Sequence, residues 1–342
     1  MKKIKSKYDK MMRLVSSLNL PDYRYEQITK AVFLQRMECF SDMYLLPKQL
    51  RDALTETFGD HVIGVSAASS QSSEQTSKLL FRLSDSKQVE AIGLKYERGW
   101  ESFCISSQCG CGFDCRFCAT GTIGLKRNLT ADEITDQLLY FLLRGHKLSS
   151  ISFMGMGEAL ANPYLFDALA ILTDPALFAL SQRRITISTI GIIPGIQKLA
   201  QTFPQVNLAF SLHSPFEGQR SELMPVNKRF PLREVMYALD DHIRNTGRRV
   251  FIAYIMLKGV NDSAEHAQAL AGILRDRGSW KYLYHVDLIP YNSTDKTSLR
   301  FQASDRQSIG RFSKILKESG ISVAVRTQFG SDISAACGQL YC

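Results

Sequence analysis

Residues 109–121 read CGCGFDCRFCATG and place four of the chain's eight cysteines within ten positions. Cys111, Cys115 and Cys118 have the spacing C-x3-C-x2-C. A structural zinc site needs four ligands, usually as two close pairs, and the sequence has no second C-x2-C pair to complete one. Three thiolates on an iron–sulfur cubane instead leave one iron with an open position, as catalytic metal sites do. The spacing therefore favours a catalytic cluster over a zinc knuckle.

The composition indicates a large globular protein with a basic surface. The chain has 342 residues, of which 45% are hydrophobic, enough for one barrel of about 200–250 residues and a smaller appendage. Its formal net charge is +9, which favours a polyanion such as nucleic acid, although a solvated surface has the same composition.

Targeting and membrane signals do not appear in the sequence. No apolar run reaches the ~18 residues that a membrane span requires, and the basic N-terminus has no secretory apolar segment. The sequence therefore predicts a cytoplasmic protein that does not bind a membrane, and we expect a monomer. In that reducing compartment, eight cysteines indicate metal binding or catalysis before structural disulfides.

The periodicity of apolar residues divides the chain into three parts. Residues 1–60 favour short helices, and residues 61–98 favour short strands. Residues 99–342 alternate between strands and helices. The predicted strands are 102–108, 150–156, 184–190, 206–214, 249–257, 282–290 and 321–328, and the predicted helices are 130–144, 163–173, 194–203, 231–244, 263–277 and 304–320. Six such units predict an α/β fold with a parallel sheet, either doubly wound or curled into a barrel.

Polar residues follow several of these predicted strands at their carboxyl ends. They are Gly155, Gly157, Glu158, Ser188, Ser211, His213, Tyr291 and Asn292. Parallel α/β folds place their binding sites at this edge of the sheet. Each residue alone is an ordinary turn residue, but together they predict the rim of a site.

The motif C-x3-C-x-F-C, following the first strand of a six-unit α/β chain, resembles the radical S-adenosylmethionine (SAM) superfamily. That resemblance implies a partial (β/α)6 barrel and a [4Fe–4S] cluster whose open iron holds SAM. The resemblance extends to the Cfr/RlmN family, which methylates one adenosine of 23S rRNA in the peptidyl transferase centre. It rests on the segments ESFCISSQCGCGFDCRFCATG, SFMGMGEAL, STIGIIPGI, FSLHSP, AYIMLKGVND and AACGQL.

Two features are most similar to Cfr-type members of that family. Ala159 stands where RlmN-type sequences usually carry proline, and residues 326–341 read RTQFGSDISAACGQLY. Cfr-type members methylate C8 of the adenine and give resistance to ribosome-targeting antibiotics. The alternative within the family is an RlmN-type C2 methyltransferase, which shares the catalytic residues.

The resemblance also implies the roles of individual residues. Cys111, Cys115 and Cys118 hold the cluster, while Gly157, Glu158, Ser188, Ser211, Leu212, His213 and Asn292 contact SAM. Cys337 takes a methyl group from a first SAM, and a radical from a second SAM then removes a hydrogen from it. The resulting carbon radical adds to the adenine, and Cys104 releases the product by thiol–disulfide exchange with Cys337.

Glu90 matches the family's acceptor for the ring proton. By position alone, Glu90 is a solvent-facing strand carboxylate and His213 is a structural histidine. Cys39, Cys109 and Cys342 match no catalytic position. The implied partners are 23S rRNA, bound in part by the helical N-terminal domain, and a flavodoxin-like reducing electron donor. A different class, a non-catalytic iron–sulfur or zinc RNA-binding protein, does not need the thiol of Cys337.

Overall fold

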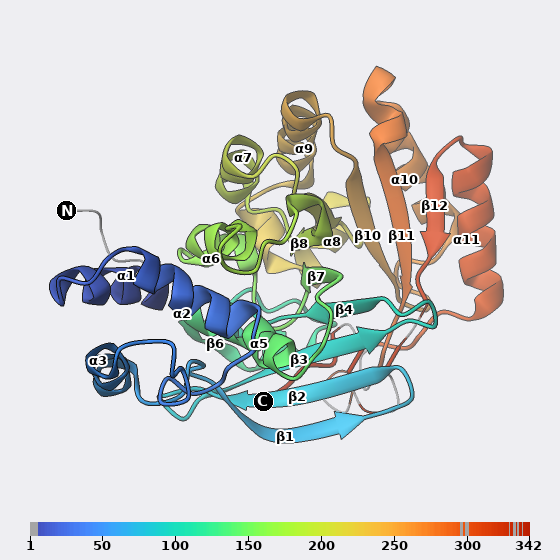
Figure 1. The fold of residues 1–342 in the computed structure, drawn as a ribbon. Helices are drawn as coiled ribbons and strands as arrows, with labels where there is room; N and C mark the ends of the chain where they lie inside the picture. Colours follow the sequence, from blue (N-terminus) through green and yellow to red (C-terminus); the bar gives the residue numbers. More distant parts are fainter. Residues whose placement is uncertain are drawn as a thin grey trace.

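The computed structural model describes residues 6–294, 297, 301–327, 329–330, 333, 335–336 and 338–342, and its centre is a ten-stranded sheet. The strand order is β1-β2-β3-β4-β7-β8-β9-β10-β11-β12 (Figure 1). These strands are β1 (Ser66–Ser72), β2 (Thr76–Arg82), β3 (Gln88–Lys95), β4 (Glu101–Cys104), β7 (Ser150–Phe153), β8 (Ile185–Thr189), β9 (Asn207–Ser211), β10 (Val250–Met256), β11 (Tyr284–Pro290) and β12 (Ser322–Val325).

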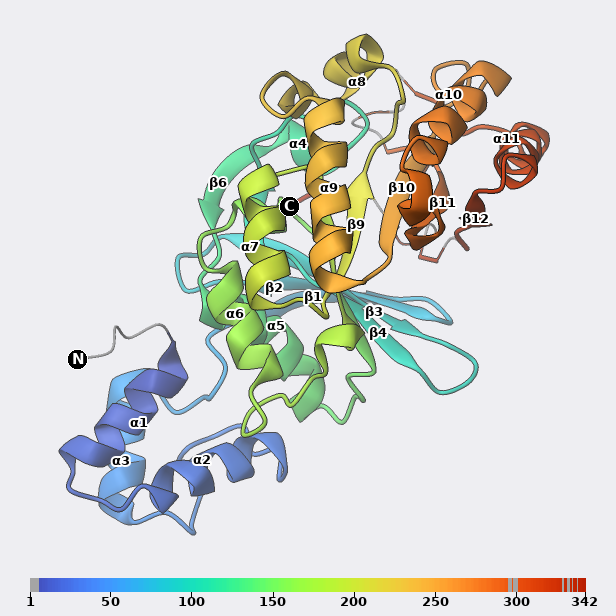
Figure 2. The same ribbon diagram turned by 90° about the horizontal axis from the view of Figure 1, so that it is seen from above.

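From β4 onward the neighbouring strands pair in parallel, and a helix follows each strand before the next begins. These helices are α5 (Ala131–Leu143), α6 (Leu165–Thr173), α7 (Ile193–Thr202), α9 (Leu232–Thr246), α10 (Ala264–Arg275) and α11 (Arg306–Glu318). They cover one side of the curved sheet (Figure 2). The predicted partial (β/α)6 barrel is therefore confirmed.

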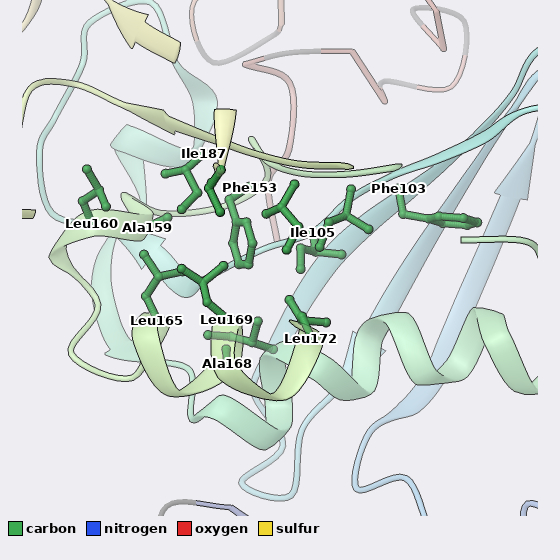
Figure 3. Packing of buried hydrophobic residues seen from close by; sticks show 14 of the residues in the cluster. Phe103, Ile105, Phe153, Ala159, Leu160, Leu165, Ala168, Leu169, Leu172 and Ile187 are labelled. Carbon is green, nitrogen blue, oxygen red and sulfur yellow. The ribbon is translucent and has the colours of Figure 1, made fainter. Parts of the chain in front are cut away.

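The two faces of the parallel strands differ in polarity. In β8, Ile185 and Ile187 are buried, whereas Thr186 and Ser188 are only partly buried, because successive side chains of a strand point to opposite faces. Figure 3 shows the apolar face, where leucines of α6 such as Leu169 lie below Phe153 and Ile187. Helix packing thus uses one face of the sheet and leaves the other to line the barrel interior.

Helices α1 (Lys7–Ser17), α2 (Tyr23–Phe33) and α3 (Lys48–Phe58) form a group beside α5 and α6 (Figure 2). The ammonium group of Lys7 forms a buried ion pair with Asp136 on α5. Its backbone N–H donates to Asp132, and the N–H of Gly64 donates to Asp136 over 2.7 Å. Thr130 caps α5, which leaves the Asp132 carboxylate to hold the N-terminal helices.

The strands predicted within residues 61–98 belong to the same sheet as the barrel. β1, β2 and β3 pair antiparallel, and β3 pairs antiparallel with β4. This arrangement fixes Ile92 opposite Cys104. The antiparallel strands therefore extend one side of the barrel and carry Glu90 toward its interior.

The sequence did not predict the short elements of the loops. Those between parallel strands are β5 (Gln108–Cys111), α4 (Ala119–Thr122), β6 (Gly124–Asn128), η1 (Ala159–Ala161), η2 (Gln182–Arg184), α8 (Glu217–Leu223), η3 (Pro225–Lys228) and η4 (Gly278–Leu283). β5 and β6 form a separate two-stranded sheet around the cysteine motif. Within the described ranges, every helix is too short or too polar to cross a membrane.

Candidate active site

The three spaced cysteines lie on one loop that leaves the carboxyl end of β4. Cys111 ends β5, and Cys118 is the N-cap of α4. The N–H of Cys118 donates to the carbonyl of Cys115 over 3.0 Å and closes the turn between them. Gly110 makes the hairpin possible, because it has φ +75° and a Cβ there would lie 1.9 Å from the carbonyl oxygen of Gly124.

The cysteine thiols occupy an apolar site close to one another. Burial raises the pKa of Cys111 to about 12 and that of Cys115 well above its usual range, and the charges of the neighbouring thiols raise both further. Three thiolates in such a site need compensating positive charge, which iron ions supply. In the part of the chain that the structure describes, no three His, Cys, Asp or Glu side chains are arranged so that they could hold one metal ion together. The donor set thus fits a cluster, whose irons take one thiolate each, better than a lone zinc ion.

Gly157 and Glu158 follow β7 and pack against the cysteine loop. Gly157 has φ +96°, and a Cβ on it would lie 2.4 Å from the Cβ of Gln108. The side chain of Gln108 accepts a hydrogen bond from the N–H of Glu158 over 2.8 Å and donates to Asn128 over 2.7 Å. Gln108, which the sequence analysis missed, therefore holds the Gly157 turn against the β5–β6 hairpin.

The Glu158 carboxylate is buried among backbone donors. It accepts hydrogen bonds from the N–H of Ile190 at 2.9 Å and from that of Leu160 at 3.2 Å. Burial raises its pKa to about 7, against the effect of these bonds. Each carboxylate oxygen has two acceptor sites, so the predicted bond from a ligand ammonium remains available, and it stays a prediction.

The predicted SAM contacts from β8 and β9 lie side by side. The hydroxyl oxygens of Ser188 and Ser211 are 3.5 Å apart. Leu212 is buried, and its N–H donates to the carbonyl of Ala253 on β10. Asn292 is buried after β11 and lines the barrel interior.

His213 joins this row to the cysteine loop. Its ring lies edge-on to Phe117, with centroids 4.9 Å apart. Its Nδ1 accepts a hydrogen bond from the N–H of Ile255 over 3.0 Å, and burial lowers its pKa to about 3. The imidazole is therefore neutral at physiological pH, and its proton is on Nε2.

Arg220 supports the site from α8, although no motif in the sequence marked it. Its guanidinium is fully buried and donates to the carbonyls of Leu212, Ile190 and Ser211 and to the Asn227 side chain. Its positive charge lowers the pKa of Cys115. Arg220 thus fixes the ends of β8 and β9 and offsets part of the negative charge of the thiolates.

A cavity of about 620 Å³ fills the barrel interior. Cys104 lines it together with Asn292, Ala336 and Leu340. Cys337, the predicted methyl carrier, lies outside the described residues. The structure therefore brings Cys104 and the residue that precedes Cys337 to one cavity.

Glu90 is buried rather than facing solvent. Its carboxylate accepts a hydrogen bond from the N–H of Tyr341 over 2.8 Å and lies 3.5 Å from the ammonium of Lys78. Burial raises its pKa, while Lys78 acts in the opposite direction. Glu90 lies two positions along β3 from Ile92, which lines the barrel cavity.

The remaining cysteines have contacts of their own. The thiol of Cys109 donates to the carbonyl of Gln88 over 3.1 Å, and that of Cys342 lies 3.4 Å from the Met156 sulfur. Cys39 lies 3.6 Å from the ring of His61, far from the barrel interior in sequence and in the fold. These contacts assign no catalytic role to the three thiols.

Comparisons with known proteins agree with this geometry. A model of the radical SAM superfamily matches residues 105–271. Over 340 residues the chain is 69% identical to ribosomal RNA large subunit methyltransferase Cfr of Clostridium botulinum (strain Langeland), covering 99% of this chain and 98% of that protein. It is 57% identical over 337 residues to the Staphylococcus aureus protein of the same name, covering 98% and 97%.

A solved structure has the same fold over nearly the whole chain. The crystal structure of a radical SAM methyltransferase from Sphaerobacter thermophilus is 37% identical, covers 97% of each chain and has a TM-score of 0.91. Membership of the superfamily implies a [4Fe–4S] cluster and SAM as cofactors, as predicted. The chain belongs to the Cfr family of ribosomal RNA large subunit methyltransferases, within the radical SAM superfamily.

Proposed function

We propose that this protein methylates C8 of a specific adenosine in the peptidyl transferase centre of 23S rRNA and thereby gives resistance to antibiotics that bind the ribosome. Two relatives, 69% and 57% identical, are named ribosomal RNA large subunit methyltransferases. The choice of C8 rests on the Cfr-type features, namely Ala159 and the run at 326–341.

The observation that carries the proposal is the position of the C-terminal segment, defined as residues 335–336 and 338–342. The N–H of Ala119, next to the cysteine motif, donates to the carbonyl of Gly338 over 2.9 Å. At the other end, the N–H of Tyr341 donates to Glu90. The residues that directly follow position 337 therefore reach from the cysteine loop to the proposed base, which supports Cys337 as the methyl carrier.

When bound, the cluster and SAM supply methyl groups and a carbon radical able to remove an unactivated hydrogen. The chain's own part is to carry and release the methyl carbon. The sulfur of Cys337 holds that carbon and links it to the adenine. The Cys104 thiolate then forms an S–S bond with the Cys337 sulfur as the C–S bond breaks, and the released methylene takes a proton to become the methyl group. A thiol reductant restores both cysteines before the next turnover.

After the carbon radical has added to the adenine, the ring must lose one electron, for which the bound cluster would be the acceptor, and one proton, which Glu90 accepts. A general base is most effective when its pKa approaches the working pH, and burial moves the pKa of Glu90 in that direction. The neighbouring ammonium of Lys78 stabilises the carboxylate before it takes the proton. The bond from Tyr341 ties the position of the base to that of the C-terminal segment.

Further parts of the proposal concern partners and place of action. A flavodoxin-like protein supplies the electrons, and the helices within residues 1–60 bind RNA through the basic surface of that segment. The enzyme acts in the cytoplasm, because its proposed substrate is ribosomal RNA, and it acts as a monomer.

Mass spectrometry of nucleosides from treated, previously unmodified 23S rRNA tests the proposal. We expect 8-methyladenosine. Dominant 2-methyladenosine would instead assign the RlmN-type reaction to the same site. If no methylated adenosine formed and the reduced protein did not cleave SAM, the protein would be a non-catalytic RNA-binding protein.

A further inference from the structure

The turn between β3 and β4 exposes two aromatic side chains. Residues 96–100 read YERGW, and the N–H of Tyr96 donates to the carbonyl of Trp100 over 2.8 Å. This bond places one aromatic residue on each side of the hairpin. Trp100 is 64% exposed and Tyr96 is 38% exposed. So much aromatic surface in water at one turn indicates a binding function rather than packing.

These side chains line a groove of about 760 Å³ that adjoins the barrel cavity. Tyr96, Thr327 and Phe329 line both hollows. The rings of Tyr96 and Phe329 meet edge to face, with centroids 5.5 Å apart. The groove therefore adjoins the cavity that Cys104 and Ala336 line.

The groove lies between the amino ends of β4 and β7 and the residues that follow β12, Thr327 and Phe329. Its lining includes Ser150, the first residue of β7, and Trp100, which directly precedes β4. The cysteine motif follows the carboxyl end of β4, and there the bonds from Ala119 and Thr120 hold the C-terminal segment over the loop. An RNA base thus has an aromatic path into the cavity beside the amino ends of β4 and β7.

The charges around the groove favour unpaired bases over a duplex backbone. Arg98 and Glu97 both line the groove, so their charges offset each other. The guanidinium of Arg326, in the adjoining cavity, is bonded to Asp287 at 2.8 Å. Binding to duplex phosphates needs an excess of positive charge, whereas stacking of unpaired bases needs aromatic faces. The chemistry of the groove is that of a single-strand stacking site.

We propose that Trp100 and Tyr96 stack against the unpaired nucleotides next to the target adenosine and guide that base into the barrel cavity. The proposal rests on the proposed function, since it assigns the flanking part of the same RNA substrate. Trp100 is a positioning residue for the RNA and takes no part in the chemistry.

A binding assay with fluorescently labelled decauridylate tests the stacking site without any methylatable base. Trp100→Ala should weaken binding about 5- to 100-fold, the usual range for one lost stacking partner, and Trp100→Phe should restore most of the affinity. Tyr282→Ala is the matched control, because Tyr282 is equally exposed at 65% but lies on η4, away from the groove. The control should bind like the wild type.

Intrinsic fluorescence gives a second readout, since the chain has only two tryptophans. In a Trp280→Phe variant, decauridylate should quench Trp100 emission saturably. Unchanged emission at saturating RNA, or a Trp100→Ala variant that binds like the Tyr282→Ala control, would overturn the proposal. If the groove binds a protein partner instead of RNA, decauridylate should leave Trp100 emission unchanged and Trp100→Ala should bind RNA like the control.

Methylation kinetics with a 23S rRNA fragment separate this inference from the proposed function. Trp100→Ala should raise KM for the fragment while kcat stays close to the wild-type value. If the wild-type enzyme methylates the fragment and the Trp100→Ala variant has the same KM, the stacking site is refuted and the proposed function is not. A wild-type enzyme that forms no methyladenosine would refute the proposed function, whatever Trp100 does.

Discussion

The cysteine loop and the C-terminal segment reach the same active site by different routes. All three cysteines of the loop lie within residues 111–118, and short-range backbone bonds shape the loop. The C-terminal segment instead depends on bonds such as Thr120 to Leu340 and Glu90 to Tyr341, which span 220 and 251 positions of sequence. The loop is therefore specified by local spacing, whereas the segment is positioned only after the sheet has formed.

The largest expected effect is the loss of the iron–sulfur cluster when a cysteine of the loop is replaced. Cys115→Ala removes one of the three proposed ligands, so the reconstituted protein should lose its cluster and all SAM cleavage. Iron analysis and the visible absorbance of anaerobically reconstituted protein measure this. Cys39→Ala is the control and should keep both, because Cys39 contacts His61 outside the barrel. Full iron content in the Cys115 variant would refute the ligand assignment.

The next largest effect concerns Arg220, which fixes the ends of β8 and β9 beside the cysteine loop. Arg220→Met leaves four acceptors without their donor, two of them in buried hydrogen bonds, and we expect the free energy of unfolding to fall by about 3 kcal/mol. Arg244→Met, in an exposed pair with Asp241, should change it by less than about 0.5 kcal/mol. Urea unfolding of both variants makes the comparison. Equal values for the two would show that the Arg220 contacts add no net stability.

Two glycines with positive φ, Gly157 and Gly259, separate the stability cost of a steric clash from that of backbone strain. Gly157→Ala introduces a Cβ 2.4 Å from Gln108 at φ +96°, whereas Gly259→Ala introduces one at φ +68° with no atom within 4 Å. We expect a loss of about 1–3 kcal/mol at Gly157 and a smaller loss at Gly259, which has the strain without the clash. Thermal unfolding gives both values, and SAM affinity should fall only in the Gly157 variant. A greater loss at Gly259 would contradict the packing argument.

The smallest expected effect is a pH dependence of folding stability that arises from Glu90, which binds the C-terminal segment. Burial raises the pKa of Glu90 above its usual value of 4.5. The stability that Glu90 contributes is therefore complete below pH 4.5 and is lost as the pH rises through the raised folded-state pKa. Relative to Glu90→Gln, the wild type should lose stability as the pH rises above 4.5, as denaturant unfolding at several pH values will show. The opposite slope would mean that Lys78 outweighs burial.

Much of the fold and part of the site follow from sequence patterns. From residue 99 onward, apolar residues recur with a helical period in some segments and a strand period in others. This pattern predicts the barrel helices and strands, because one face of each must be apolar. The spacing of the cysteines predicts their common loop for the same local reason. Gln108 and Arg220 were missed because their partners, such as Asn128 and Ile190, become neighbours only through tertiary contacts. Glu90 was read by position alone as exposed, yet the distant Tyr341 covers it.

Cys104, in the barrel, is proposed to complete chemistry that begins on Cys337 of the C-terminal region. The most direct measurement is a denaturing gel of Cys104→Ala incubated with substrate RNA under turnover conditions, with Cys337→Ala beside it. We predict that Cys104→Ala accumulates a covalent protein–RNA adduct, because nothing releases the linked methylene, and that Cys337→Ala forms none. A Cys104→Ala variant that forms no adduct, or that turns over like the wild type, would contradict the account.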